Sequence, residues 1–302
     1  MGLVIDHSLF TIHIVCLLMI VQEARQELNN SLANIYNECE AKNITELVME
    51  HITRWSRTEQ IDNKDLPFSY AQGELLRNIE ARLVKHEPIQ YILQEAWFAG
   101  LKFYVDRSVL IPRPETDELV DWIIRDCKTQ AKQFKMLDIG TGSGCIAIAI
   151  KTKLTAVEMW ACDVSDPALT VARMNADTHQ AAIDFVAIDF LDKVQRKQLG
   201  FFDVIVANPP YVPQKDKEPM KKNVVDYEPH VALFVSDEKP LIFYEAIADF
   251  GQEHLHDEGC IYLEIHEEMG KQVSELFKQK KYSSVELKKD MQGKDRMVKI
   301  CK

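Results

Sequence analysis

A four-residue segment, Asn-Pro-Pro-Tyr at positions 208–211, carries the polar groups in this chain that are best arranged for chemistry. It follows an apolar run at 204–207 that is typical of a buried strand. Proline fixes φ and has no N–H, and Asn208, which precedes a proline, is driven to an extended conformation. Its side-chain amide offers one acceptor oxygen and two donor hydrogens. The loop therefore suits a planar –NH2 group, such as an amide or the exocyclic amine of a base.

A glycine-rich loop follows another predicted strand at 136–139. Its glycines Gly140, Gly142 and Gly144 allow a sharp turn and a close approach to a ligand, and the N–H groups of the next helix face that ligand. Asp163 ends the following predicted strand, about 20 residues later, where a carboxylate can accept hydrogen bonds from ribose hydroxyls. The pattern predicts a nucleotide cofactor, either a dinucleotide or S-adenosylmethionine.

Two details favour S-adenosylmethionine. The glycine spacing is Gly-x-Gly-x-Gly and not Gly-x-Gly-x-x-Gly. Asp138 precedes the loop, where a carboxylate would repel a pyrophosphate but is compatible with a cationic cofactor. Asp189 and Phe190 follow the third predicted strand, and we expect Phe190 either to stack on the adenine or to be an ordinary core residue.

The composition is that of a globular protein, since 46% of the 302 residues are hydrophobic and 27% are charged. The formal net charge of −11 argues against a protein that wraps duplex nucleic acid, because phosphate binding needs a basic surface. The seven cysteines include no Cys-x-x-Cys pair. They predict buried thiols in a reducing compartment, with neither a disulfide framework nor a zinc site.

The first 22 residues include a largely apolar run from Leu9 to Val21. This run is too short for a confident membrane span. It lacks the basic start and small-residue cleavage site of a signal peptide, and it is poor in the Arg and Ser of a mitochondrial presequence. We expect a packed N-terminal helix, with a targeting segment as the alternative.

The patterning of apolar residues divides the chain into three parts. Helical spacing runs from about Val21 to Ile92 and predicts a small helical domain. Alternation between Trp97 and Ile111 predicts a β-hairpin that turns at residues 106–108. From Lys135 onward, strands and helices alternate as in a doubly wound α/β domain with a mostly parallel sheet.

The predicted strands are residues 136–139, 157–163, 183–188, 203–207, 260–265, 284–287 and 297–301, and the predicted helices are 145–153, 167–179, 240–255 and 267–280. Only a tight turn at 290–295 separates the last two strands. That is too short for a parallel crossover, so we expect them to pair antiparallel.

Further motifs occur in a fixed order around the two loops. They are Glu-Pro-Ile-Gln-Tyr-Ile at 87–92, Leu-Ile-Pro-Arg-Pro-Glu-Thr at 110–116, Tyr-Glu-Pro at 227–229, Leu-Glu-Ile at 263–265 and Gly-Lys-Asp-Arg at 293–296. With them the chain, from about residue 45 to its end, resembles the HemK/PrmC family, the protein-(glutamine-N5) methyltransferases of peptide chain release factors.

The resemblance implies a class I S-adenosylmethionine-dependent methyltransferase fold. That fold is α/β and Rossmann-like, with a seven-stranded sheet whose last strand is antiparallel and with a small N-terminal helical domain. The implied division is an apolar segment (1–22), a substrate-recognition domain (23–95), a β-hairpin linker (96–111) and a methyltransferase domain (112–302).

The resemblance also implies the reaction, which is methylation of the side-chain amide nitrogen of the glutamine in a Gly-Gly-Gln motif. The expected catalytic residues are Asn208, Pro209 and Tyr211, and the substrate-binding residues are Asn208, Pro209, Pro210 and Tyr211. The expected cofactor-binding residues are Asp138, Gly140, Thr141, Gly142, Gly144, Asp163, Asp189, Phe190 and Asn208. Arg113, Glu115 and Thr116 are expected to support the site, and no metal is expected.

Two other functions remain open on the residues alone. A DNA or RNA adenine-N6 methyltransferase would use the same loop on another planar amine, but it must flip a base and grip phosphates, and no basic patch is evident. A non-catalytic protein-binding module is the third reading, against which the glycine loop and Asp163 argue.

The expected partner is a class I release factor with a Gly-Gly-Gln motif, bound by a monomer that forms no stable complex with nucleic acid or membrane. The apolar start favours the mitochondrial matrix, with a bacterial cytoplasm as the alternative location. Three departures from the family pattern stand out. Gln94 and His266 replace usual glycines, and residues 234–238 replace glycines that usually follow Ala-Leu.

Overall fold

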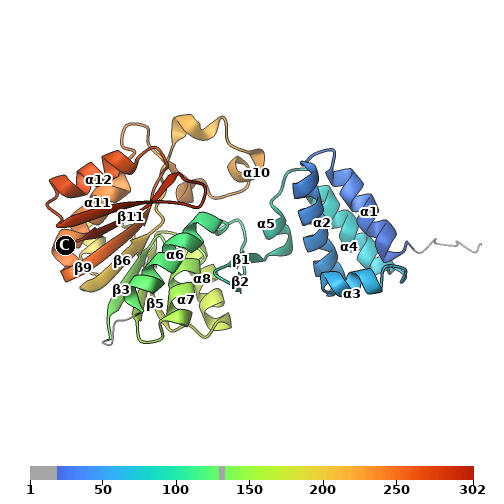
Figure 1. Ribbon diagram of the computed structural model, residues 1–302, viewed down its shortest axis with the longest axis horizontal. Helices are drawn as coiled ribbons and strands as arrows, with labels where there is room; N and C mark the ends of the chain where they lie inside the picture. Colours follow the sequence, from blue (N-terminus) through green and yellow to red (C-terminus); the bar gives the residue numbers. More distant parts are fainter. Residues whose placement is uncertain (1–18, 129–132) are drawn as a thin grey trace, which may run out of the picture. The chain divides into compact units, whose positions relative to one another are not determined.

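The computed structural model describes residues 19–128 and 133–302, and these residues form two compact units that divide between Lys85 and His86 (Figure 1). Most of the apolar run that starts at Leu9 lies outside the described residues. The four-part division stays a prediction, and the contacts place the unit boundary earlier than position 95. The short helix α5 (Ile89–Leu93) belongs to the larger unit, since the Tyr91 hydroxyl donates to the Val109 carbonyl at 2.6 Å.

The smaller unit is helical, as predicted. Its helices are α1 (Val21–Leu32), α2 (Glu38–Thr53), α3 (Arg57–Asp62) and α4 (Tyr70–Leu83). Helices α1, α2 and α4 each pack a stripe of apolar residues at three- and four-residue spacing, such as Leu76, Ile79 and Leu83 on α4. The side chains of Asn37 and Ser69 cap α2 and α4 by accepting backbone N–H groups of the first turn.

The predicted β-hairpin is present, but its turn lies elsewhere. Strands β1 (Ala96–Phe98) and β2 (Leu101–Phe103) pair antiparallel around Ala99 and Gly100, whose φ angles are 51° and 78°. The prediction of a hairpin turn at 106–108 is wrong. Asp106 forms a turn within a loop, where its carboxylate accepts the Ser108 N–H at 2.8 Å. Residues 104–113 belong to no strand.

Among the described residues, seven strands form the central sheet in the order β10-β11-β9-β6-β3-β4-β5 (Figure 1). Their bounds are β3 (Lys135–Ile139), β4 (Glu158–Asp163), β5 (Ile183–Ala187), β6 (Phe202–Ala207), β9 (Leu255–Glu264), β10 (Ser284–Lys289) and β11 (Asp295–Cys301). Strand β11 runs antiparallel to both of its neighbours, and the pairs between β9 and β5 are parallel. The predicted fold class is therefore confirmed.

Two layers of helices cover the sheet. Helices α6 (Pro114–Cys127), α7 (Cys145–Lys153) and α8 (Asp166–Thr178) share one hydrophobic core, while α11 (Ile242–His254) and α12 (Gly270–Gln279) share the other. Successive strand residues alternate between the cores, as Met136 and Leu137 do on β3. Both helix layers are visible in Figure 1.

Short elements complete the larger unit. They are α9 (Lys193–Arg196), α10 (Lys222–Val225), the 3-10 turns η1 (Gln214–Lys217) and η2 (His230–Ala232), and the paired strands β7 (Val212–Pro213) and β8 (Phe234–Val235). Within the two described ranges, no helix is both long enough and apolar enough to cross a membrane.

The strand order reverses at β3, because the chain leaves β3 for β4 and β5 on one side and returns to β6 on the other. In open α/β sheets, ligands bind at the carboxyl ends of the strands beside such a reversal. Both predicted loops lie there, the glycine loop after β3 and the Asn-Pro-Pro-Tyr loop after β6.

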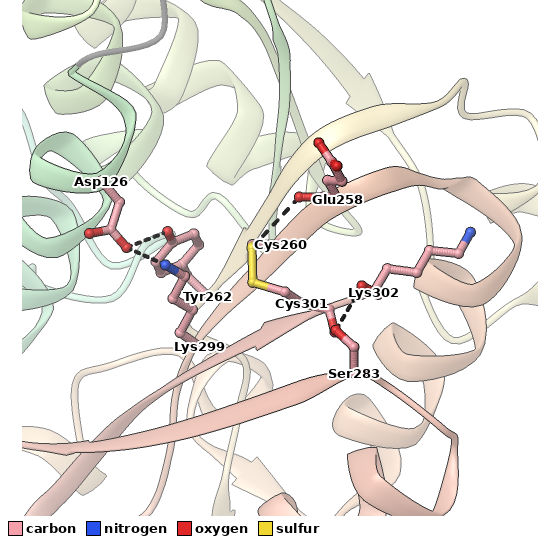
Figure 2. The surroundings of a disulfide bond; sticks show 8 residues. All are labelled: Asp126, Glu258, Cys260, Tyr262, Ser283, Lys299, Cys301 and Lys302. Atoms are coloured by element: carbon pink, nitrogen blue, oxygen red, sulfur yellow. Dashed lines mark hydrogen bonds and ion pairs between the residues drawn. A yellow bond between two sulfur atoms is a disulfide. The ribbon is translucent and has the colours of Figure 1, made fainter.

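Cys260 and Cys301 form a disulfide bond, which corrects the prediction of reduced thiols throughout (Figure 2). They face each other on β9 and β11, with Cα atoms 4.2 Å apart. Tyr262 on β9 and Lys299 on β11 each lie two residues from the cysteine of their strand, and both donate to the Asp126 carboxylate of α6. The sequence could not reveal this pairing, because 41 positions separate the two cysteines.

Cys127, Cys145 and Cys162 are buried thiols as predicted, whereas Cys39 is an exposed thiol, contrary to the prediction. Burial raises the pKa of Cys127 to about 11 and that of Cys145 to about 12, so both are uncharged near neutral pH.

The disulfide closes a 41-residue separation in sequence, so its removal should destabilise the protein. We expect Cys301→Ser to lower the free energy of unfolding by about 2–4 kcal/mol in denaturant titrations without reductant. Dithiothreitol should lower the Tm of the wild type and leave the Tm of Cys301→Ser unchanged. An equal effect of reductant on both proteins would show that the bond does not form.

Candidate active site

A cavity of about 290 Å³ opens at the carboxyl ends of the parallel strands. Eight predicted site residues line it: Gly140, Gly142, Asp163, Asp189, Phe190, Asn208, Pro209 and Pro210. Segments that were given no cofactor or substrate role, at 108–110 and 229–232, supply further walls. The cavity thus brings the glycine loop, the β4 carboxylate and the Asn208 loop together.

The glycine loop leaves one side open toward this cavity. Gly140 and Gly142 have φ angles of 71° and 54°, and a Cβ at either position would meet no atom within 4 Å. The Gly142 N–H donates to Asp163 Oδ2 at 2.9 Å, and the Ser165 N–H donates to Oδ1 at 2.9 Å. These two bonds orient the carboxylate and leave lone pairs free for a ligand hydroxyl.

Gly144 has a different role from Gly140 and Gly142. It caps α7 with a φ of 79°, and a Cβ there would lie 3.0 Å from Ile148 Cδ1 and 3.2 Å from the Ala172 Cβ. This positive φ and the close packing of α7 on α8 both require glycine at position 144. Gly144 does not line the cavity.

Asp138 and Thr141 also lie outside the cavity lining. The Thr141 hydroxyl donates to Asp138 Oδ2 at 2.7 Å, and the Asp138 side chain is fully buried. Burial raises the pKa of this carboxyl to about 7, against an ordinary value of 3.8. The pair supports the glycine loop from the interior of the protein.

Phe190 is a core residue that also lines the cavity, and its stacking on an adenine stays a prediction. It packs edge-to-face on Phe250 at 5.2 Å between ring centroids and is 5% exposed, yet it also lines the cavity. Asp189 lines the cavity as well, and its Oδ1 accepts the Leu191 N–H at 2.9 Å.

Asn208 belongs to a chain of hydrogen bonds that leads into the protein interior. Its Nδ2 donates to Thr116 Oγ1 at 3.1 Å, and the Thr116 hydroxyl donates to Glu264 Oε2 at 2.6 Å. The Tyr211 hydroxyl donates to Glu264 Oε1 at 3.0 Å. Thr116 and Tyr211 therefore hold the Asn208 loop from behind, and neither lines the cavity.

Glu264 is the residue that sequence reasoning missed. It was part of the Leu-Glu-Ile motif but received no role. It is 1% exposed at the end of β9, and burial raises its pKa, opposed by hydrogen bonds from Thr116 and Tyr211. An acid within a buried apolar strand was the available signal, since such a group must find partners.

Arg113 connects two walls of the cavity. Its guanidinium pairs with Glu228 Oε1 at 2.6 Å, and Glu228 Oε2 accepts the Ile111 N–H at 3.2 Å. Glu228 is buried, which raises its pKa, while the Arg113 charge opposes that shift. This ion pair ties the segment after Ser108 to the segment before Val231.

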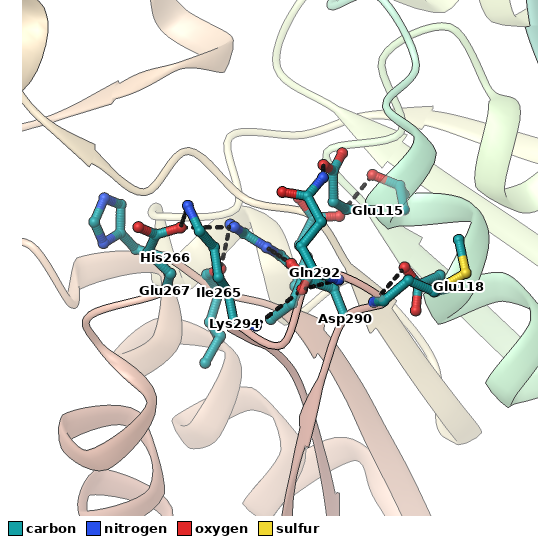
Figure 3. A network of polar contacts seen from close by, with 12 residues as sticks. Glu115, Glu118, Ile265, His266, Glu267, Asp290, Gln292 and Lys294 are labelled. Carbon is teal, nitrogen blue, oxygen red and sulfur yellow. Dashed lines mark hydrogen bonds and ion pairs between the residues drawn. The ribbon is translucent and has the colours of Figure 1, made fainter. Parts of the chain in front are cut away.

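Glu115 does not line the cavity and lies beside the turn between β10 and β11 (Figure 3). Gln292 Nε2 donates to Glu115 Oε1 at 3.4 Å, and the Met291 N–H donates to Glu118 Oε1 at 3.1 Å. Arg296 forms ion pairs with Asp290 and Glu267, each at 3.2 Å, which hold the turn against the end of β9. These contacts position the first turn of α6.

The residues that depart from the family pattern each have a defined conformation or packing in the structure. Gln94 ends α5 with a φ of 57°, the conformation that glycine adopts most easily, and its Nε2 donates to the Tyr104 hydroxyl at 3.0 Å. His266 packs edge-to-face on Tyr211 with ring centroids 6.0 Å apart, and its φ is not positive. Phe234 and Val235 are buried in strand β8.

The raised pKa of Asp138 makes the stability of the protein depend on pH. The native pKa of about 7 exceeds the unfolded value of about 3.9, so the stabilisation linked to this group is fully present below about pH 4 and is lost as pH rises to about 7. We expect the Tm of Asp138→Asn, taken relative to the Tm of the wild type at the same pH, to rise by several degrees from about pH 5 to about pH 8. Thermal unfolding of both proteins measures this, and an equal Tm difference at both pH values would contradict it.

Comparison with known proteins gives two family matches. The family described as PrmC N-terminal domain matches residues 23–93, and the family described as Methyltransferase small domain matches residues 115–226. In the solved structure of the hMettl16 catalytic domain in complex with the MAT2A 3'UTR hairpin 6, the similarity covers 83% of this chain and 90% of that chain, with a TM-score of 0.53. At 13% sequence identity, this likeness concerns the fold alone.

Two curated relatives are similar over nearly their whole length. The release factor glutamine methyltransferase of Flavobacterium psychrophilum is 39% identical over 93% of this chain and 99% of its own length. The protein of the same name from Bacteroides thetaiotaomicron is 40% identical over 90% of this chain and 96% of its own length. The chain therefore belongs to the family of release factor glutamine methyltransferases.

Proposed function

We propose that this chain methylates the side-chain amide nitrogen of the glutamine in the Gly-Gly-Gln motif of a peptide chain release factor. The names of its relatives support this reaction. The observation that carries it is the arrangement of Asn208, whose Nδ2 is held by Thr116 while its side chain lines the cavity. Its Oδ1 is left to accept a hydrogen from an amide.

S-adenosylmethionine is the methyl donor of this family, and the residues present fit it. Gly140 and Gly142 leave open space beside the cavity, Asp163 is oriented to accept hydroxyls, and Phe190 offers an aromatic surface. When bound, the cofactor supplies a methyl group activated by a positively charged sulfur. The net acidic charge of the chain is compatible with a cationic ligand.

The residues of the Asn208 loop would prepare the amide for attack. An amide nitrogen is a weak nucleophile because its lone pair is delocalised into the carbonyl. Asn208 Oδ1 and the Pro209 carbonyl would each accept one N–H hydrogen, which fixes the nitrogen and directs its lone pair into the cavity. The gain is mainly one of positioning in a water-poor site, and the proton that leaves would pass by way of Asn208 Oδ1 to water.

The partner is proposed to be a class I release factor, bound by a monomer that forms no stable complex with nucleic acid or membrane. The compartment is also a proposal. The two relatives named above are bacterial, which favours a bacterial cytoplasm over the mitochondrial matrix predicted from the apolar start. The segment behind the mitochondrial prediction lies mostly before Met19, outside the described residues.

Asn208→Ala should separate catalysis from cofactor binding. We expect it to lower methyl transfer to a release factor by about 100-fold or more, since it removes an acceptor that acts on the reacting amide. Calorimetry should find S-adenosylmethionine affinity within a few-fold of wild type. Asp163→Ala is the matched control, and we expect it to weaken cofactor binding instead. Near wild-type methylation by Asn208→Ala would refute the role of this residue.

The substrate atom is tested with labelled cofactor and two forms of the release factor. One has the native Gly-Gly-Gln motif and the other has its glutamine replaced by alanine. Label should enter only the native form. Equal labelling of both forms would contradict the proposed function, and so would label found in an oligonucleotide but not in the release factor.

A further inference from the structure

The side-chain amide of Asn208 can point in two ways, related by a half-turn that exchanges oxygen and nitrogen. Only one of them directs Oδ1 at an incoming –NH2 group. The opposite orientation would present two N–H donors to the substrate's own N–H hydrogens and would repel it. Some feature of the protein must therefore select between two nearly isosteric states.

The Thr116 hydroxyl makes this selection. It has a single hydrogen, which it donates to Glu264 Oε2 at 2.6 Å. Its oxygen can then only accept, and it accepts from Asn208 Nδ2 at 3.1 Å. With the amide reversed, Asn208 Oδ1 would face the Thr116 oxygen with no hydrogen between the two atoms.

The Glu264 carboxylate sets the direction of the hydrogen bonds that run from Asn208 through Thr116. Glu264 accepts a hydroxyl hydrogen at each of its two oxygens, which is how an acceptor-only carboxylate behaves, and it thus draws the Thr116 hydrogen away from Asn208. Its other oxygen accepts the Tyr211 hydroxyl at 3.0 Å, so both oxygens are engaged. Glu264 and Thr116 are 1% and 2% exposed, which leaves little room for water to substitute for either partner.

Two elements that are far apart in the sequence supply these groups. Thr116 lies in the first turn of α6, where its N–H bonds the Arg113 carbonyl at 3.1 Å, and Glu264 is the last residue of β9. The Tyr244 hydroxyl donates to the Glu264 carbonyl at 3.2 Å and so fixes the end of the strand. The backbones of Thr116 and Glu264 are therefore held by parts of the scaffold outside the Asn208 loop.

We propose that Glu264 and Thr116 are positioning residues, which fix the Asn208 amide with its oxygen toward the substrate through a one-way chain of hydrogen bonds. The inference rests on the proposed function, because it concerns the residue that receives the glutamine amide. Neither positioning residue lines the cavity. They raise the fraction of enzyme molecules in which Asn208 presents its Oδ1 acceptor, and not its Nδ2 donors, to the substrate amide.

Substitutions at position 116 test the inference. Thr116→Val keeps the side-chain shape but removes the acceptor, and we expect kcat to fall by about 10- to 100-fold with S-adenosylmethionine affinity unchanged. Thr116→Ser keeps the hydroxyl and should restore kcat to within about threefold of wild type. If Thr116→Val does not fold, as judged by its Tm, Thr116→Ala replaces it in the comparison with Ser.

A double-mutant cycle tests the role of Glu264. Because Glu264 acts on Asn208 through Thr116, the loss in kcat caused by Glu264→Gln should largely disappear in the Thr116→Val background. The inference is overturned if Thr116→Val retains wild-type kcat, if Ser and Val are equally impaired, or if the two losses simply add. These outcomes require a wild-type enzyme that methylates only the Gly-Gly-Gln glutamine. Failure of that reference reaction would instead overturn the proposed function.

Discussion

The buried carboxylate of Glu264 holds together three segments that the candidate active site requires. It receives hydrogen bonds from Thr116 at the start of α6 and from Tyr211 in the loop after β6, and it ends β9 itself. An unpaired charge in this position would be strongly unfavourable. The donors must therefore stay in place, and the Asn208 loop stays with them. Burial makes this group both a structural centre and a constraint on the direction of each hydrogen bond.

The sheet topology explains why this centre lies beside the cavity. Strands β3 and β6 are neighbours in the sheet although β4 and β5 come between them in the chain. The glycine loop and the Asn208 loop thus leave the same edge side by side. The β4 carboxylate, Asp163, reaches the glycine loop through the Gly142 N–H at 2.9 Å. The methyl-donor side and the amide side of the cavity are set by two adjacent parallel strands.

Local patterns predicted most of the fold. Apolar runs placed the seven strands and the four helices predicted after Lys135 to within about five residues, and the short turn at 290–295 correctly predicted an antiparallel end of the sheet. The position of the hairpin turn was not predicted because Ala99 adopts a positive φ, and alanine in a sequence does not indicate that conformation. The Cys260–Cys301 disulfide was missed because only strand order and register bring the two thiols together.

The candidate site was predictable in part. Residues that combine an unusual type with a strand end, such as Gly140, Asp163 and Asn208, do line the cavity. Chain position alone could not show that Gly144 serves helix packing or that Asp138 lies beneath the loop. The link from Thr116 to Glu264 spans 148 positions, so it depends wholly on the tertiary fold.

The most direct test of this account is a crystal structure of the protein with S-adenosylhomocysteine and a Gly-Gly-Gln peptide. We expect the glutamine amide nitrogen to lie about 3 Å from both Asn208 Oδ1 and the Pro209 carbonyl oxygen, with Thr116 still between Asn208 and Glu264. A glutamine side chain bound elsewhere would contradict it, as would an Asn208 amide with its nitrogen toward the substrate.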